Sequence, residues 1–96
     1  MATVKARPAK LSLRLYTAGS APNSLRAVEN ARAICEEHFQ SKYVLEVVDL
    51  LQHPLRALED GIIVTPTLLR IWPLPVMRLI GNLSDAQRVL QALESA

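Results

Sequence analysis

The stretch that decides the fold is Val64-Thr-Pro-Thr-Leu-Leu-Arg-Ile-Trp-Pro73, closely followed by Val76-Met-Arg-Leu-Ile-Gly-Asn-Leu-Ser84. Residues 67–72 and 76–80 are apolar runs separated by a proline-rich turn, which predicts an antiparallel pair of strands. The Thr-Pro-Thr sequence that enters the first strand is where a cis X–Pro bond would be placed. Ser84-Asp-Ala-Gln87 then predicts a helix start, because serine followed three residues later by glutamine forms a capping box.

The residues upstream of this stretch predict a strand followed by a long helix. Residues 11–16 alternate leucine with more polar neighbours, which is typical of a strand with one buried face. A helix is expected over residues 22–39, because proline suits the first helical turn and Ser20 or Asn23 can cap it. Its inward-facing apolar residues recur at three- and four-residue steps: Leu25, Val28, Ala31, Cys35 and Phe39.

A second strand and a short helix are expected before the strand pair. Residues 43–49 form a β-rich run with one acidic residue inside it, which favours a strand buried on most of both faces. The helix that precedes this strand implies parallel pairing with the first strand. A short helix over residues 54–61 would turn Leu55 and Leu58 inward and end at Gly61. The expected order is therefore βαβαββα, an α/β fold.

The length of the chain predicts one small domain, and its charge bears on the expected partners. With 96 residues the chain has room for a single core, and we predict a flexible N-terminal segment over residues 1–10 and a domain over residues 11–96. The formal net charge of +2 is weak, and its basic residues gather only near the start, so no nucleic-acid partner is expected. No apolar run approaches the roughly 20 residues of a membrane span, and no secretory signal is visible, so we expect a cytoplasmic protein without membrane contact. The basic residues near the start, expected to form a solvated tail, are Lys5, Arg7, Lys10 and Arg14.

Few side chains offer catalytic chemistry. Cys35 is the only cysteine, and its place on the apolar stripe favours a small buried hydrophobe over a nucleophile. His38 and His53 have no cysteine or aspartate at metal-ligand spacing, so no metal site is expected. The acidic pairs Glu36-Glu37 and Glu59-Asp60 fit solvated helix faces. We therefore expect neither enzymatic activity nor a cofactor.

The strand pair and helix start described first resemble the second half of a thioredoxin-like fold. In that fold the reactive cysteine pair follows the first strand, whereas Thr17-Ala-Gly-Ser-Ala-Pro-Asn-Ser24 contains no cysteine. The resemblance implies a scaffold without redox chemistry, and hence a domain that binds a partner.

A wider resemblance, from Leu11 to about Leu93, is to the KaiB family of bacterial clock proteins. The blocks that carry it, in order and at the family's spacing, are Leu15–Ala27, Val48–Leu50 with Pro54, Glu59-Asp60, Thr65–Leu68, Pro73–Pro75 and Ile80–Ser84. The resemblance implies a non-enzymatic protein that binds the N-terminal ATPase ring of KaiC, sequesters KaiA and competes with the sensor domain of the kinase SasA. It also implies two folds for one sequence: a dimeric or tetrameric ground state of order βαββααβ, and a monomeric thioredoxin-like βαβαββα state that binds KaiC.

Matches to the family pattern supply candidate site residues. Asn23, Arg26 and Asp49 are the expected partner-binding residues, although Arg26 is equally well explained as a solvated helix residue. Trp72 is expected to anchor an oligomer interface rather than the core, because large aromatic residues concentrate at interfaces.

Five residues in the second half of the chain are expected to act in the fold switch: Pro66, Pro73, Pro75, Ala92 and Glu94. The prolines also serve as turn and strand punctuation. Ala92 and Glu94 stand where family members commonly have glycine and aspartate, and alanine favours a helix over glycine by up to about 1 kcal/mol. We therefore predict a larger thioredoxin-like population than in the clock members.

Differences from the family pattern make some of the expected partners stronger candidates than others. Glu29, Glu46 and Gly61 replace basic residues common in the clock members, which weakens steering toward an acidic partner. A KaiC-like ATPase is thus the expected partner, and KaiA or a SasA-type kinase is a weaker candidate. Two other functions stay open: a sensor-type thioredoxin-like domain that docks on a histidine kinase or stress regulator, and a degenerate peroxiredoxin- or thioredoxin-class enzyme that uses Cys35.

Overall fold

The computed structural model describes residues 11–95, in which strands and helices follow the order βαβαββα. This is the order expected from the sequence for the thioredoxin-like arrangement, and it differs from the alternative βαββααβ. The segment expected to be flexible, residues 1–10, lies outside the described residues.

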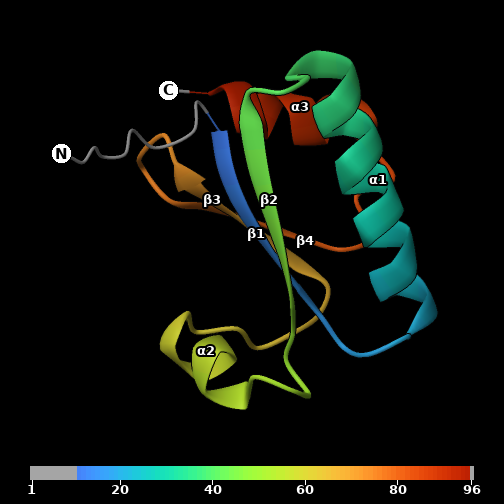
Figure 1. Ribbon diagram of the computed structural model, residues 1–96, viewed down its shortest axis with the longest axis vertical. Coiled ribbons are helices and arrows are strands. Elements are labelled where there is room, and N and C mark those ends of the chain that lie inside the picture. The colour runs from blue at the N-terminus through green and yellow to red at the C-terminus, as the bar shows by residue number, and fades with distance from the viewer. Residues whose placement is uncertain (1–10, 96) are drawn as a thin grey trace, which may run out of the picture.

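One mixed sheet of four strands forms the centre of the molecule, in the order β2-β1-β3-β4 (Figure 1). β1 (Leu11–Thr17) pairs in parallel with β2 (Tyr43–Asp49) and antiparallel with β3 (Thr67–Trp72), while β4 (Met77–Ile80) pairs antiparallel with β3. The parallel pair is the one that a crossover helix requires, and the last two strands form the expected hairpin.

The two faces of the sheet are covered unequally. α1 (Pro22–His38) and α3 (Ala86–Glu94) pack on one face, whereas the short α2 (Pro54–Glu59) covers only one end of the other (Figure 1). Tyr16, Val48, Ala57 and Leu69 form the small apolar cluster beneath α2. The larger core, between the sheet and the two longer helices, consists of Leu11, Leu13, Leu15, Ala27, Ala31, Ile34, Cys35, Leu68, Leu83, Val89 and Leu93.

The expectation that the second strand is buried on both faces is wrong. β2 is an edge strand, and Val48 is its one buried residue. Val44, which lies on the same face as α2, is exposed because α2 reaches only one end of that face. Val47, which lies opposite Leu15 and therefore on the α1 face, is exposed as well. The β-rich composition of the strand therefore reflects strand propensity more than burial.

Helix starts differ from the sequence expectations in their capping residues. α1 begins after Ala21 with no side-chain cap, so Ser20 and Asn23 do not cap it. Asp85 caps α3 by accepting a hydrogen bond from the Arg88 amide at 3.2 Å. Ser84 lies one residue too early for the expected capping box, because the helix starts at Ala86.

The inward-facing residues of two helices were also partly mispredicted. Leu25 of α1 and both Leu55 and Leu58 of α2 are exposed. α2 has only six residues, and Ala57 is the one that it buries. The end of α2 is as expected, since Gly61 follows it with a left-handed φ of 68°, a conformation that glycine adopts without steric cost.

The Thr65–Pro66 bond is cis, as the Thr-Pro-Thr sequence predicted. The Trp72–Pro73 and Leu74–Pro75 bonds are cis as well.

Candidate partner-binding surface

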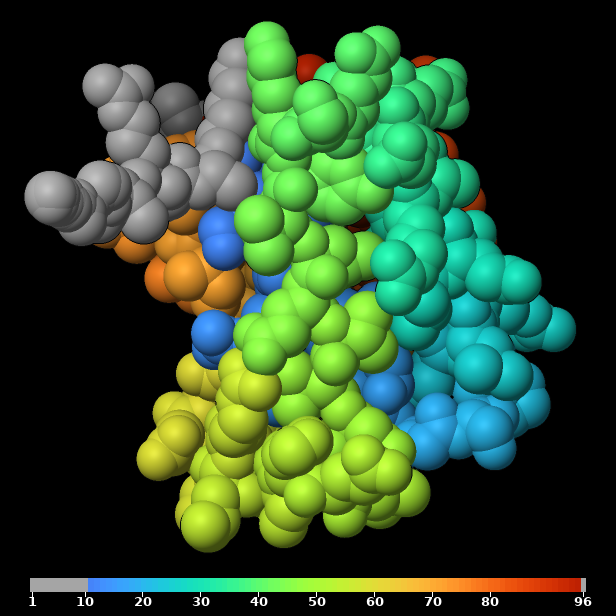
Figure 2. Space-filling model, in the orientation of Figure 1, coloured from blue at the N-terminus to red at the C-terminus, as the bar shows by residue number. Residues whose placement is uncertain are grey.

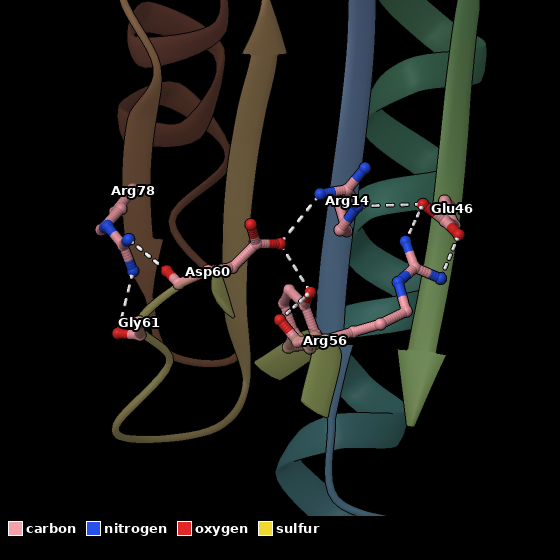
Figure 3. A network of polar contacts seen from close by, with 7 residues as sticks. Arg14, Glu46, Arg56, Asp60, Gly61 and Arg78 are labelled. Atoms are coloured by element: carbon pink, nitrogen blue, oxygen red, sulfur yellow. Dashed lines mark hydrogen bonds and ion pairs between the residues drawn. The ribbon is translucent and has the colours of Figure 1, made fainter. Parts of the chain in front are cut away.

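A network of charged side chains fastens α2 to the less covered face of the sheet (Figure 3). Arg14 of β1 lies at its centre, with Nε 3.0 Å from Glu46 Oε1 and Nη1 2.8 Å from Asp60 Oδ2. Arg56 of α2 donates two hydrogen bonds to Glu46, at 2.7 and 2.9 Å. The hydroxyl of buried Tyr16 lies 2.5 Å from Asp60 Oδ2 and 3.0 Å from the Arg56 carbonyl oxygen. The network therefore joins two strands to Arg56, in the last turn of the short helix, and to Asp60, its C-cap residue.

Strand register explains how these residues meet. Arg14 lies directly opposite Glu46 in the parallel pair, so both side chains project from the same face, beside α2. Two expectations fail here: Arg14 belongs to a strand and an ion-pair network instead of a solvated tail, and Asp60 is held by Arg14 and Tyr16 instead of by solvent. Glu59 is exposed, as expected.

A second tie holds the segment that follows α2. Arg78 of β4 donates hydrogen bonds to the carbonyl oxygens of Asp60 and Gly61, the latter at 3.3 Å (Figure 3). The end of α2 is thereby fastened to both β1 and β4, from the same face of the sheet.

The network shifts the protonation equilibria of its members. The paired hydrogen bonds from Arg56 outweigh the effect of burial and, with Arg14, lower the pKa of Glu46 to about 2. Burial opposes ionisation of Asp60, but the hydrogen bonds from Tyr16 and Arg14 outweigh it and lower the pKa of Asp60. Burial, and then the bond to Asp60, raises the pKa of Tyr16. Both carboxylates are therefore ionised at neutral pH, and the phenol is neutral.

Acid should weaken the network through Glu46. Its pKa is depressed in the folded state, so its contribution to the unfolding free energy is complete above the ordinary value of 4.5 and is lost as pH falls toward about 2. Because Glu46 is partly exposed, we expect wild type to lose about 1 kcal/mol more than Glu46→Gln across this window, measured by urea unfolding. Glu29→Gln, which removes an exposed carboxylate from α1, is the matched control. Equal acid losses in wild type and Glu46→Gln would contradict the expectation.

Large apolar side chains project from this tethered segment into solvent. Four of them define what we call the α2 surface: Leu51, Leu55, Leu58 and Ile63, which are 67%, 72%, 74% and 94% exposed. The segment forms the lower, yellow-green end of the molecule in Figure 2. Single exposed leucines are ordinary, but several large exposed apolar side chains on one tethered segment are typical of an interaction site.

Comparison with known proteins assigns the family. A sequence model of the KaiB domain matches residues 14–95. The chain belongs to the KaiB family. The circadian clock oscillator protein KaiB of Synechococcus elongatus is 50% identical over 82 residues, which cover 85% of this chain and 80% of that protein. The protein of the same name from Prochlorococcus marinus is 51% identical and is covered over 69% of its length.

Solved structures show a thioredoxin-like fold for this member of the KaiB family. The N-terminal domain of Synechococcus elongatus SasA aligns with a TM-score of 0.75 at 24% identity and covers all of this chain and 94% of that domain. Mitochondrial thioredoxin 3 of Saccharomyces cerevisiae aligns with a TM-score of 0.74 at 10% identity, over 92% of this chain and 80% of thioredoxin. At these identities the likeness concerns the fold alone.

The expected partner-binding residues of this KaiB-family chain lie near the ends of β1 and β2. Asn23 and Arg26 are exposed on the first turns of α1, with Arg26 Nη1 3.5 Å from Asn23 Oδ1. Asp49 instead organises a loop, because its Oδ1 accepts hydrogen bonds from the Gly19 and Leu51 amides at 3.0 and 2.9 Å. Asp49 thus sits beside the α2 surface, and the partner roles of all three residues remain predictions.

Trp72, Pro73, Pro75, Ala92 and Glu94 lie at the opposite end of the sheet, whereas Pro66 precedes β3 at the end near α2. Trp72 pairs with Ser12 near the start of β1 and is 40% exposed, so it is available for an interface but not shown to form one. Ala92 and Glu94 are in the last turn of α3, as their helix preference suggested.

Cys35 is the candidate for enzymatic chemistry, and its surroundings disfavour a reactive thiolate. The side chain is fully buried, and burial, together with the nearby Glu36 charge, raises the pKa of the thiol to about 11. A thiol of this kind supplies little thiolate at neutral pH. Within residues 11–95, no group of histidine, cysteine and acidic side chains could hold a metal ion, and no helix could cross a membrane.

Proposed function

We propose that this KaiB-family protein is a non-enzymatic clock or clock-related regulator that binds the N-terminal ATPase ring of a KaiC-type protein in the thioredoxin-like arrangement. The observation that carries the proposal is the 50% identity to proteins named circadian clock oscillator protein KaiB, over 85% of this chain. The thioredoxin-like fold supports it, because the resemblance assigns partner binding to that arrangement.

The α2 surface supplies a physical basis for docking. Its leucines and Ile63 contribute little to the protein's own core, so their apolar area is available for burial against a partner. The network through Arg14, Glu46 and Asp60 holds the helix in place before binding, and a preorganised surface loses less entropy when it docks. Asn23 and Arg26 are proposed to extend this surface with polar contacts.

Size-exclusion chromatography with a KaiC-type ATPase from the same genome, in the presence of ATP, tests the proposal. We expect the chain to elute in a large ring complex. If it elutes alone with every such ATPase and instead retains a histidine kinase in pull-down experiments, the sensor-domain alternative holds, and the proposal is wrong.

We further propose that Ala92 and Glu94 raise the population of the thioredoxin-like fold over an alternative fold. Since glycine and aspartate are poorer helix formers, the double variant Ala92→Gly/Glu94→Asp should shift the balance by about 1 kcal/mol toward the alternative. NMR spectra of both proteins would report the two populations as separate peaks. Arg88→Lys, an exposed change in the same helix, should leave the populations unchanged. Identical populations in the double variant and wild type would remove these residues from the switch.

A further inference from the structure

Arg70 of β3 is a buried cation in an otherwise apolar strand. It is 1% exposed and projects toward the face covered by α3, between Leu13 and Met77 of the neighbouring strands. None of its hydrogen bonds goes to a carboxylate within residues 11–95. Its bonding groups face main-chain carbonyl oxygens instead.

The end of α3 receives most of these bonds. Arg70 Nη1 lies 2.9 Å from the Ala92 carbonyl oxygen, 3.5 Å from that of Leu93 and 2.5 Å from that of Ser95. The last carbonyl groups of a helix have no partners within the helix, and they carry its negative dipole end. A guanidinium placed there satisfies both the hydrogen bonds and the charge.

The other helices end differently, which makes this arrangement specific to α3. α1 closes with the Phe39 amide donating to the Cys35 carbonyl oxygen, and α2 closes with the Asp60 amide donating to that of Arg56. α3 ends at Ser95 in extended conformation, without such a main-chain bond. Arg70 takes the place of a C-terminal cap.

The same guanidinium also holds the β3–β4 turn. Arg70 Nη2 donates to the Pro75 carbonyl oxygen at 3.1 Å, and Nε has no partner within the described chain. All of its hydrogen bonds thus connect two segments, the end of α3 and the turn, to the centre of the sheet. The Ser95 hydroxyl, 3.2 Å from Met77 Sδ, adds a weaker link between the same parts.

We infer that Arg70 is a latch: its guanidinium holds α3 and the β3–β4 turn on the sheet, and its loss lets α3 open as a unit while the remainder stays folded. α3 is suited to such opening, because it has nine residues and buries only Val89 and Leu93. The latch would act in the same way whichever partner the protein binds.

Native-state amide hydrogen exchange of Arg70→Met, Arg70→Lys and the matched control Arg88→Met tests the latch. In Arg70→Met the main-chain carbonyl groups at the end of α3 lose their hydrogen bonds to a charged group, so we expect exchange of the α3 amides to accelerate at least about tenfold. The acceleration should be smaller in Arg70→Lys, because lysine keeps the charge but lacks the several N–H donors of the guanidinium group. The β1 and β2 amides should accelerate much less. Arg88→Met, which removes an exposed arginine from α3 itself, should exchange as wild type does.

Two results would overturn the inference. One is unchanged α3 exchange in Arg70→Met. The other is acceleration of α3 and β1 by the same factor, which would make Arg70 an ordinary contributor to global stability. If Arg70→Met does not fold, the same two criteria apply to Arg70→Lys.

Discussion

Replacing Leu55 and Leu58 together by aspartate should weaken binding to a KaiC-type ATPase at least about a hundredfold and leave the fold intact. Both side chains are exposed on α2, so folding does not depend on their burial. In the proposed complex the burial of each leucine side chain would contribute about 1.5 kcal/mol or more to the binding free energy. Losing both contributions corresponds to the hundredfold weaker binding. Calorimetric titration would give the dissociation constant, and thermal unfolding would show that the variant is folded.

A matched pair of substitutions separates the α2 surface from a general effect of charge. Leu74 and Val76 are also exposed but lie in the β3–β4 turn, at the opposite end of the sheet. Leu74→Asp/Val76→Asp should bind as wild type does. A folded Leu55→Asp/Leu58→Asp protein with unchanged affinity would place the interface elsewhere.

Removing the guanidinium of Arg14 should lower the free energy of unfolding by about 2 kcal/mol. Arg14→Met leaves Asp60 and Glu46 without their shared cation, in a region where Arg14 and Asp60 are each about three-quarters buried. The cost should lie between the 3–5 kcal/mol of breaking a fully buried pair and the roughly 1 kcal/mol of an exposed one. Urea unfolding measures it, and amide exchange in α2 should rise at the same time.

Arg32→Met is the control, since Arg32 is exposed on α1 and the change should stay within about 0.5 kcal/mol. If Arg14→Met itself lowers the free energy of unfolding by less than about 0.5 kcal/mol, the network contributes little to stability. The α2 surface would then be positioned by the apolar cluster around Tyr16 and Ala57 instead.

Local patterns were enough to predict the order of elements in this chain. Strand alternation in residues 11–16, the proline at the start of α1 and the Thr-Pro-Thr entry to β3 each report on neighbouring residues only. The strand, the helix start and the cis bond were confirmed, although Tyr16, expected on the open face of the strand, is buried beneath α2. The boundaries of α3 were nearly right for the same reason, although Asp85, and not Ser84, caps the helix.

Features that depend on strand order and register could not be predicted this way. The sequence of Tyr43–Asp49 does not indicate that the strand lies at an edge of the sheet. Its β-rich composition suggested burial instead. Arg14, Glu46 and Asp60 meet only because two strands align and α2 lies over their end, although they are up to 46 residues apart. Arg70 was visible as a lone charge in an apolar strand, but most of its acceptors are 22 to 25 residues away, at the end of a helix.

The buried thiol of Cys35 has a practical consequence for work on this protein. It is the only cysteine, it has no access to solvent, and its pKa of about 11 keeps it protonated. A second cysteine introduced at an exposed position, such as Gln91 on α3, should react with maleimide dyes far faster than the native one. Fluorophores can therefore be attached at a single chosen site without mutating the core.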